Sequence, residues 1–281
     1  MTPDELSAAI EKAITAAERS LQRAMSANER EAMAGILDQI ARLKIKGSRI
    51  IPNTANLKIK ASIRRNLDKL IFGADFQAGV NAVIAGIEKI AELLDIYFTE
   101  FAGFAQGPQL KALIESASQQ VAITLSGQGW GASVTNAVDE MFQTSITSAS
   151  TPRELIMQIR DFIERGGLET FNRVNVKQIA TDAMGQFMRT YMKQASDRLK
   201  LDWYRYAGGL VKDTRDFCRA RDGKYFHRSE IEKWPELTWD GKVKGTNSAT
   251  IYSYLGGWNC LHHLTPVKAA RVPATDRARI A

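Results

Sequence analysis

The chain has 281 residues, of which 44% are hydrophobic and 25% are charged. These values are typical of a soluble globular protein, and they exclude wholesale disorder. No uncharged apolar run approaches the roughly 18–20 residues that cross a bilayer, and the N-terminus lacks the basic start and apolar core of a signal peptide. We therefore expect no membrane-spanning segment and folding in a cytoplasm, where the two cysteines need not form a disulfide.

The charge is divided unevenly along the chain. Residues 1–150 hold 15 Lys and Arg against 16 Asp and Glu, a net of −1, whereas residues 151–281 hold 23 against 15, a net of +8. A basic half indicates a polyanionic or acidic partner. The alternative is a solvated face without a special partner, because acidic residues are interspersed and no long Lys/Arg block exists.

The N-terminal residues predict helices. Thr2 and Glu5 have the spacing of a capping box, in which each side chain bonds the backbone N–H of the other residue. Apolar residues then recur at helical spacing through residues 10–25 and again through residues 29–43. We therefore expect the chain to begin with helical runs that bury one face.

A basic connector follows, from residue 44 to about residue 60. Gly47 and Pro52 interrupt it, and the proline discourages a helix through that point. Residues 57–60 alternate like a short strand, but they could equally begin the next helix, which we expect over residues 61–72.

Residues 77–103 give the clearest helical pattern. Its wide apolar stripe is more typical of a core or a subunit contact than of a ligand site; the stripe consists of Val80, Val83, Ile84, Ile87, Ile90, Ala91, Leu94 and Tyr97 or Phe98. Further helices are predicted over residues 109–125 and 132–143. The glycine cluster between them lacks the Lys-Ser/Thr ending of a phosphate-binding loop, and a helix–helix turn is the favoured interpretation.

The remaining chain changes from helix to a mixed module. A Ser/Thr-rich linker is expected over residues 144–151, after which Thr151 and Glu154 repeat the helix-start signal. A long amphipathic helix is predicted from Asn175 to about Leu201, and the aromatic-rich residues beyond it predict short antiparallel strands and loops.

The predicted fold class is therefore mainly α, with a helical N-terminal region, a long helix and a small α+β C-terminal module. The expected organisation is a helical domain or arm (1–150), a helical linker region with the long helix (151–201), the small α+β module (202–270) and a basic flexible tail (271–281).

All cysteines and histidines lie between residues 218 and 263. Thiolate sulfur and imidazole nitrogen hold structural zinc in a tetrahedron, and such a clip can supply much of the folding energy of a small module. The chain has no Cys-x-x-Cys, and either of two adjacent histidines could join the second cysteine. The candidate zinc ligands are Cys218, His227, Cys260, His262 and His263. The alternative is that both cysteines are small buried hydrophobes and the histidines bond locally.

A polar turn precedes the first cysteine. Asp213, Thr214 and Arg215 suit an Asx-type turn in which the Asp213 carboxylate accepts backbone N–H groups. Arg215 is expected to pair with Asp213 or Asp216 and to hold the turn to the strands. These are scaffold roles rather than catalytic ones.

Two further positions have expected structural roles. Gly223 supplies the positive φ of an Asp-Gly hairpin turn, which would bring Phe217 and Cys218 near residues 224–226. Asn259 is expected to orient the loop that returns to the last strand.

These motifs resemble, in their order and spacing, the C-terminal module of the phage Mu F-like minor head proteins. In that family an aromatic strand leads to an Asp-Thr-Arg turn, then to Cys or His, then to a Gly-Lys strand, and an Asn-Cys motif closes the module before a proline. The matching segments are Trp203–Tyr206, Lys212–Cys218, Asp222–Phe226 and Gly257–His262 with Pro266, and Thr181-Asp182 stands on a helix where the family has Thr-Glu. The resemblance covers about a third of the chain.

The chain departs from the family pattern at two positions. Leu261 stands where the family often has Arg, and Gly257 stands where many members have His. The second departure removes a family-style fourth metal ligand, for which His227 or His263 is the candidate replacement.

The resemblance implies a non-enzymatic minor capsid or head morphogenesis protein, present in few copies in the virion. It would be made in the host cytoplasm, would lie in the capsid interior or at the portal vertex, and would act in head assembly or in DNA packaging or delivery. The helical N-terminal part would bind the portal or major capsid protein, and the basic C-terminal half would approach packaged DNA.

The alternative function is a metal-dependent nuclease of the His-Asn-His type. His262 and His263, near Asn259 and Cys260, fit a site where a histidine activates water and a metal steadies the phosphate. The sequence shows neither a second His-bearing helix nor a carboxylate cluster for magnesium, so this interpretation ranks second.

Overall fold

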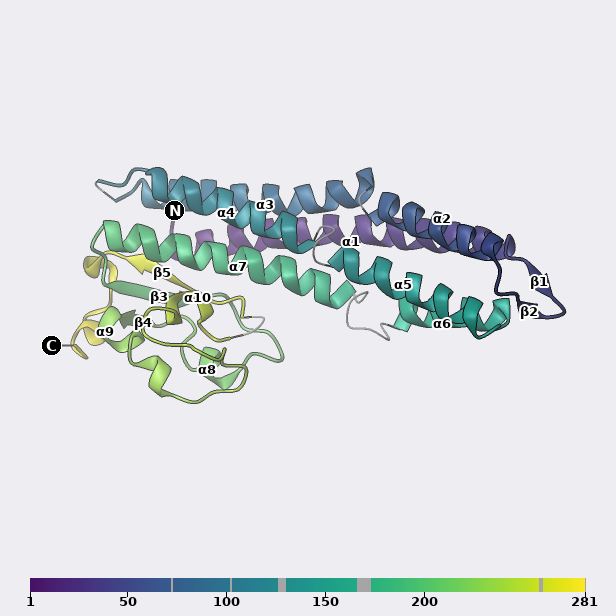
Figure 1. The fold of residues 1–281 in the computed structure, drawn as a ribbon. Coiled ribbons are helices and arrows are strands. Elements are labelled where there is room, and N and C mark those ends of the chain that lie inside the picture. Colours follow the sequence, from purple (N-terminus) through teal and green to yellow (C-terminus); the bar gives the residue numbers. More distant parts are fainter. Residues whose placement is uncertain (72, 102, 126–129, 166–172, 258–259, 281) are drawn as a thin grey trace. The chain divides into compact units, whose positions relative to one another are not determined.

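The computed structural model describes residues 1–71, 73–101, 103–125, 130–165, 173–257 and 260–280. As predicted, the fold is mainly α, with a small antiparallel sheet in the C-terminal part (Figure 1). Among the residues described, none of the helices combines the length and the apolar character that crossing a membrane requires.

Long helices form the first two-thirds of the chain. They are α1 (Pro3–Ala41), α2 (Thr54–Ile71), α3 (Ala74–Phe98), α4 (Pro108–Leu125), α5 (Trp130–Thr147), α6 (Pro152–Arg165) and α7 (Arg173–Arg198), and a short hairpin of β1 (Ile45–Lys46) and β2 (Arg49–Ile50) joins α1 to α2.

Short elements follow α7. The strands are β3 (Trp203–Ala207), β4 (Tyr225–His227) and β5 (His263–Val267), and the helical turns are α8 (Asp216–Arg219), α9 (Arg228–Ile231), η1 (Trp234–Glu236), α10 (Ile251–Tyr254), η2 (Ala269–Arg271) and α11 (Ala274–Arg277).

Both predicted capping boxes are confirmed. The Thr2 hydroxyl accepts the Glu5 N–H at 3.2 Å, while the Glu5 carboxylate accepts the Thr2 N–H at 2.7 Å. Thr151 and Glu154 repeat the pattern at 3.2 and 2.8 Å. Each box satisfies two N–H groups that a helix start would otherwise leave without a partner.

Several predicted boundaries shift. The two N-terminal apolar runs form one helix, α1, because no Gly or Pro separates them. The Ser26 hydroxyl bonds to the Gln22 carbonyl within this helix. Helix α3 ends at Phe98 instead of continuing to residue 103. The predicted linker begins later, since residues 144–147 are the last turn of α5, where Ile146 is buried in a core.

The basic connector holds a hairpin followed by a helix. Residues 57–60, which fit either a strand or a helix start, belong to α2. The buried Asn56 side chain joins the two elements: it accepts the Lys44 N–H at 2.7 Å and donates to the carbonyls of Lys44 and Ile51 at 2.9 and 2.8 Å. One amide thus satisfies backbone groups that the short hairpin leaves open.

The chain divides into two compact units that do not follow chain order. Unit 1 contains residues Met1–Ala16, Ala85–Ser118 and Ala180–Ala281, and unit 2 contains Ala17–Ile84 and Gln119–Ile179. This division cuts across the expected segments 1–150 and 151–201, because helices α1, α3, α4 and α7 each contribute residues to both units.

The core of unit 2 is built from α1, β2, α2, α5 and α6. Its buried residues are Ile36, Ile40, Leu43, Ile50, Ile63, Leu67, Val138, Phe142, Ile146, Leu155, Ile159 and Phe162. Between α2 and α5, the Lys60 ammonium pairs with the Asp139 carboxylate at 3.1 Å and donates to Gln143 at 2.9 Å.

Unit 1 contains the three-stranded antiparallel sheet, in the order β4-β3-β5. Tyr206 lies opposite Leu264, and both belong to an aromatic core beneath one face of the sheet. The other face carries Trp203 and Val267, which pack with Val272 from the expected tail.

The predicted apolar stripe on α3 is confirmed as core: all its residues except Ile84 are buried, and the Tyr97 hydroxyl donates to the Pro266 carbonyl at 2.5 Å.

Candidate metal centre

Three of the five candidate ligands come together in unit 1. Cys218 lies on α8, Cys260 lies in the loop before β5, and His262 immediately precedes that strand. Their ligand atoms all lie within 4.8 Å of one another, and the three residues are 2, 5 and 5% exposed. This buried group could hold a metal ion.

The spacing of the ligand atoms suits a tetrahedral ion. The two sulfur atoms are 3.8 Å apart, and the Cys260 sulfur is 3.8 Å from Nδ1 of His262. Metal–sulfur bonds of about 2.3 Å at a tetrahedral angle place two sulfurs about 3.8 Å apart, whereas a disulfide would need about 2.0 Å. Both cysteines are free thiols, and the observed separation, which a thiol–thiol hydrogen bond also allows, is compatible with a pair of metal ligands.

The two thiols differ in acidity. A hydrogen bond from Cys218 lowers the pKa of Cys260 well below its ordinary value. Burial acts in the opposite direction, whereas His262 and Arg189 also lower this pKa. The same bond and burial raise the pKa of Cys218. Cys260 is therefore the first thiolate, and a bound cation would compensate the cost of ionising Cys218 as well.

Gly256 lies directly against the sulfur pair. A Cβ at this position would be 2.4 Å from the Cys218 sulfur and 2.7 Å from the Cys260 sulfur. Glycine therefore leaves space beside both sulfurs that any side chain would fill. The Tyr206 ring lies 5.2 Å from the His262 ring and packs at the same place. The space beside the sulfurs fits a bound ion.

Asp222 faces the other nitrogen of the histidine ligand. Its Oδ1 lies 3.8 Å from Nε2 of His262, while Nδ1 faces the Cys260 sulfur. Metal-bound histidines commonly direct their second nitrogen to a carboxylate, which fixes the ring and its tautomer. Sequence reasoning took Asp222 only as part of a turn, and no local signal connects it to a residue forty positions away.

Arg189 anchors the loop that carries two of the ligands. This buried residue of α7 donates to the carbonyls of Ser253 at 2.6 Å, Cys260 at 2.8 Å and His262 at 3.4 Å. A guanidinium with its fixed fork of donors can hold several carbonyls at once. Sequence reasoning missed Arg189; the available signal was its place within the apolar face of the long helix.

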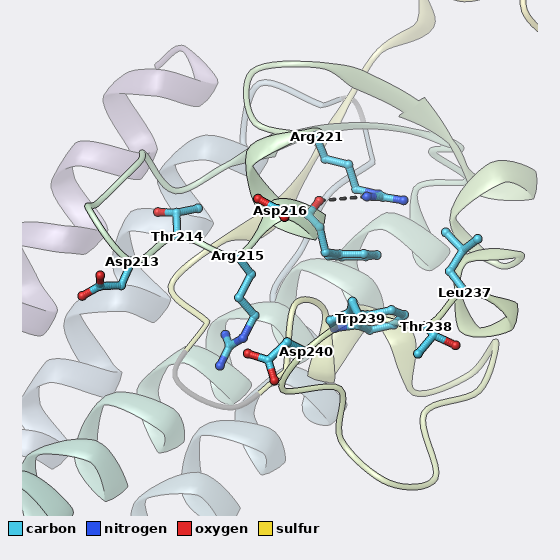
Figure 2. Close-up of a pocket in the computed structure, with 10 residues that line it drawn as sticks. Asp213, Thr214, Arg215, Asp216, Arg221, Leu237, Thr238, Trp239 and Asp240 are labelled. Atoms are coloured by element: carbon cyan, nitrogen blue, oxygen red, sulfur yellow. Dashed lines mark hydrogen bonds between the residues drawn. The ribbon is translucent and has the colours of Figure 1, made fainter.

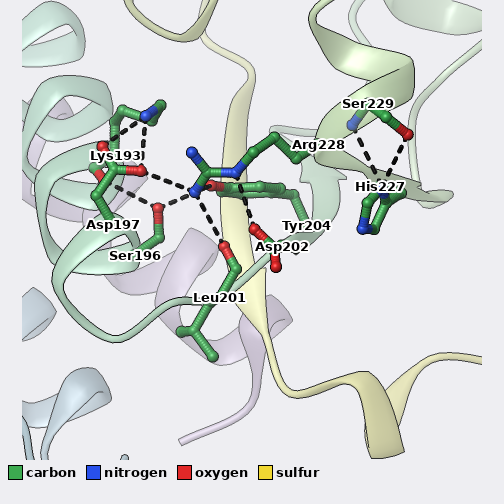
Figure 3. Close-up of polar contacts among 9 residues, drawn as sticks. All are labelled: Lys193, Ser196, Asp197, Leu201, Asp202, Tyr204, His227, Arg228 and Ser229. Atoms are coloured by element: carbon green, nitrogen blue, oxygen red, sulfur yellow. Dashed lines mark hydrogen bonds and ion pairs between the residues drawn. The ribbon is translucent and has the colours of Figure 1, made fainter.

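The two remaining histidines lie elsewhere. His227 caps α9: its Nδ1 accepts the Ser229 N–H at 3.3 Å (Figure 3). Its own backbone N–H donates to the Glu230 carboxylate at 2.9 Å. His263 opens strand β5, where alternation directs it to the face opposite Leu264. Burial lowers the pKa of His263 to about 4, so its ring stays neutral at pH 7.

The residue after His227 takes part in a separate polar cluster at the end of α7 (Figure 3). The adjacent Arg228 pairs with Asp197 at 2.7 Å and with Asp202 at 3.0 Å, and it donates to the Tyr204 hydroxyl at 3.2 Å. These contacts hold β4 and α9 against the long helix. His227, the last residue of β4 and the N-cap of α9, therefore has a structural role.

The turn before Cys218 is held differently from the prediction. The Thr214 hydroxyl, rather than the Asp213 carboxylate, accepts a backbone N–H, that of Val211 at 2.7 Å. Arg215 makes no ion pair with Asp213 or Asp216; its guanidinium packs on the backbone of Gly241, where a Cβ would be 2.5 Å from Nε. Figure 2 shows the Arg215 side chain directed toward the segment that carries Asp240, in a pocket of about 640 Å³.

The glycine turn is confirmed, but its neighbours are helical. Gly223 has φ of +74° and donates to the Tyr206 carbonyl at 2.9 Å. Phe217 and Cys218 lie on α8 instead of on a hairpin strand, and both are buried there. They still share a core with Phe226, so the expected proximity is confirmed. Asn259 lies outside the described residues.

Gly257 departs from the family pattern for a structural reason. Its φ is +99°, and a Cβ would approach the Gly241 carbonyl oxygen to 1.8 Å. A histidine ligand at this position is therefore incompatible with the backbone of this chain.

The chain matches no protein-family model, no curated protein and no solved structure, so its own geometry and sequence motifs carry the functional argument.

Proposed function

We propose that the C-terminal module binds one zinc ion through Cys218, Cys260 and His262, and that this ion clips α8 to the start of β5. The observation that carries the proposal is the buried sulfur pair at 3.8 Å with a histidine nitrogen at the same distance. Sulfur and imidazole ligands favour zinc among the common divalent ions. The clipped segments both contribute to one aromatic core.

We propose further that the chain is a non-enzymatic component of a phage head, associated with the portal or capsid. The support is the resemblance of its motifs to the Mu F-like module, together with a metal group that is buried on all sides. Structural zinc is almost always held by four protein ligands, whereas three protein ligands and an open position are typical of catalytic zinc. The three ligands here leave a fourth position to be filled, but each of them is no more than 5% exposed, so a substrate could not reach the ion and a structural role is favoured.

The nuclease alternative fits the geometry less well. His262 and His263 are 5 and 2% exposed, and a phosphodiester cannot approach a ring that is covered in this way. Incubation of the purified protein with plasmid DNA and magnesium or manganese is expected to leave the plasmid intact. Nicking that disappears in a His262→Ala variant would overturn the non-enzymatic assignment.

Association with head proteins is the test of the assembly role. The full chain, co-expressed with the portal and major capsid proteins of the same genome, is expected to co-purify with one of them and to be found in particles. A chain that is absent from particles and binds neither protein contradicts the assignment, whatever its metal content.

A methyl group at residue 256 is expected to eject the ion. Gly256→Ala places a Cβ within 2.7 Å of both sulfurs, which must separate. Overpacking of this kind typically costs about 1–3 kcal/mol before any loss of metal is counted. Metal content after dialysis measures the effect, with Gly35→Ala as control because a Cβ there has nothing within 4 Å. Full metal occupancy in the Gly256→Ala variant would contradict the proposed position of the ion.

Removing the charge of Asp222 is expected to weaken metal binding without abolishing it. Asp222→Asn keeps the shape but loses the carboxylate that faces Nε2 of His262. Loss of such a partner typically lowers metal affinity about 10–100-fold. Competition with a chromophoric chelator gives the affinity, and Asp216→Asn, an exposed change on α8, should bind like the wild type. Equal affinity of both variants would remove Asp222 from the site.

A further inference from the structure

Unit 2 contains a cluster of positive charge that the net charge of residues 1–150 does not reveal, because acidic residues elsewhere in that range offset it. Residues 39–67 contain no Asp or Glu and carry the eight cations Arg42, Lys44, Lys46, Arg49, Lys58, Lys60, Arg64 and Arg65. All of these except Lys60 are exposed. They lie at the end of α1, on the β1–β2 hairpin and along α2 (Figure 1), and we call them the basic surface.

The hairpin places its cations on one face. Lys46 lies directly opposite Arg49, across a two-residue turn in which Gly47 has φ of +63°. Lys44 is two residues before Lys46, so strand alternation directs both to the same side. Like charges directly opposite each other destabilise a strand pair. The facing cations Lys46 and Arg49 therefore destabilise the hairpin until a polyanion neutralises their charge.

Helix α2 extends the surface. Lys58 and Arg65 are both exposed and are seven residues apart, which places them on one face about two turns from each other. Exposed Lys69 continues the same face toward the end of the helix.

Most of these cations have no carboxylate partner in the part of the chain that the structure describes. Arg42 pairs with Asp38 at 2.6 Å, and Lys60 and Arg64 share Asp139 at 3.1 and 3.8 Å. Among the described residues, no ion pair neutralises the other five, which are Lys44, Lys46, Arg49, Lys58 and Arg65, although Arg49 donates to the Ala149 carbonyl at 3.1 Å.

Several cations of unit 1 are already engaged. Arg189 holds three carbonyls, and Arg228 pairs with two carboxylates. Arg271 pairs with Glu100 at 3.1 Å, and Arg279 pairs with Asp276 at 2.7 Å. The net charge of +8 for residues 151–281 points to the C-terminal half for DNA contact, but these four cations already have partners within the fold.

We propose that the basic surface binds the phosphate backbone of double-helical nucleic acid without regard to sequence. Cations of a single sign match a polyanion, whose bound counterions they release. Residues 1–71 contain no Phe, Trp or Tyr, so this region lacks the aromatic platforms on which proteins stack the bases of single strands. Contacts from Lys and Arg to phosphates position a protein on a duplex without reading bases.

Fluorescence anisotropy of a short labelled DNA duplex, titrated with the full chain at several salt concentrations, tests the proposal. Five phosphate contacts give a slope of log affinity against log salt of about −4 to −5. A hairpin variant with Lys44→Gln, Lys46→Gln and Arg49→Gln is expected to lower the magnitude of the slope by about 3. Its affinity near 0.1 M salt should fall on the order of a hundredfold.

A matched control removes the same charge from unit 1. Lys212→Gln, Lys233→Gln and Lys244→Gln neutralise three exposed lysines that are not part of the basic surface, and they should change affinity by no more than about threefold because they make no phosphate contact in the proposed complex. Three outcomes overturn the proposal: no duplex binding by the wild type, an equal loss in the control variant, or tighter binding of the single strand. The inference does not depend on the zinc ion, so these outcomes leave the metal experiments unaffected.

Discussion

Replacing Cys260 with serine is expected to release the metal ion and to unfold the C-terminal module. Cys260 is the thiol that ionises first, and its sulfur contacts both other ligands. Structural zinc contributes about 10–16 kcal/mol of apparent binding free energy in small modules, comparable with the roughly 5–15 kcal/mol that stabilises a whole domain. A loss on the order of 5 kcal/mol or more is therefore expected, seen as a large fall in Tm of the zinc-loaded protein.

The size of the effect separates a metal ligand from a buried hydrophobe. Without a metal, a serine hydroxyl in place of the Cys260 thiol would cost only about 1–3 kcal/mol for a buried polar group. The wild type and the Cys260→Ser variant are therefore each melted with and without a chelator. The chelator should lower Tm of the wild type and leave the variant unchanged. A wild type insensitive to the chelator, with a variant loss of only about 1–3 kcal/mol, would make both cysteines ordinary core residues.

Replacing Arg189 with methionine should produce the second largest effect. The carbonyls of Ser253, Cys260 and His262 would lose their donor in a buried environment. Each unsatisfied buried group costs about 1–3 kcal/mol, so a loss of about 3–5 kcal/mol is expected, even though methionine fills much of the space. Metal affinity should fall as well, because the loop that carries two ligands loses its anchor.

Denaturant unfolding and zinc competition measure the two consequences of Arg189→Met. Arg219→Met is the matched control, since Arg219 is exposed on α8 and donates to the Thr214 carbonyl at 3.2 Å. Surface changes of this kind usually cost less than about 0.5 kcal/mol. If both variants unfold at the same denaturant concentration, the three carbonyls do not depend on Arg189 for stability.

Local signals predicted the parts of the fold that depend on neighbouring residues. The capping boxes at Thr2 and Thr151 involve partners three positions away, and both form. The apolar stripe of α3 is buried as its spacing indicates. The same kind of signal was present at His227, which has Glu230 three positions later, but histidine is not a usual cap and was taken as a ligand candidate.

Local sequence patterns could not predict that Cys218, Cys260 and His262 come together. The choice of His262 over His263 follows from where β5 begins and from its alternation, neither of which the sequence specified. Gly256 matters only because it lies against two sulfurs, and Arg189 only because a loop more than sixty residues away returns to it. These contacts depend on packing between residues far apart in the sequence. The same is true of the two units, each of which is made of separate chain segments.

The resemblance to the phage module remains a prediction that the geometry neither requires nor opposes. Its Asp-Thr-Arg turn is held by Thr214, and its histidine position is filled by Gly257, which no side chain can replace without a clash. Three ligands come together among the described residues, one fewer than a tetrahedral ion takes, so water is the expected fourth ligand.

X-ray absorption at the zinc edge, with metal content measured on the same purified sample, tests whether Cys218, Cys260 and His262 hold zinc. We expect one zinc per chain, with two sulfur ligands at about 2.3 Å and nitrogen or oxygen ligands at about 2.0–2.1 Å. Cys218→Ser should remove one sulfur or the whole ion. A chain without tightly bound metal, in which both thiols react freely once the protein unfolds, or an ion bound by nitrogen and oxygen alone, would contradict the claim.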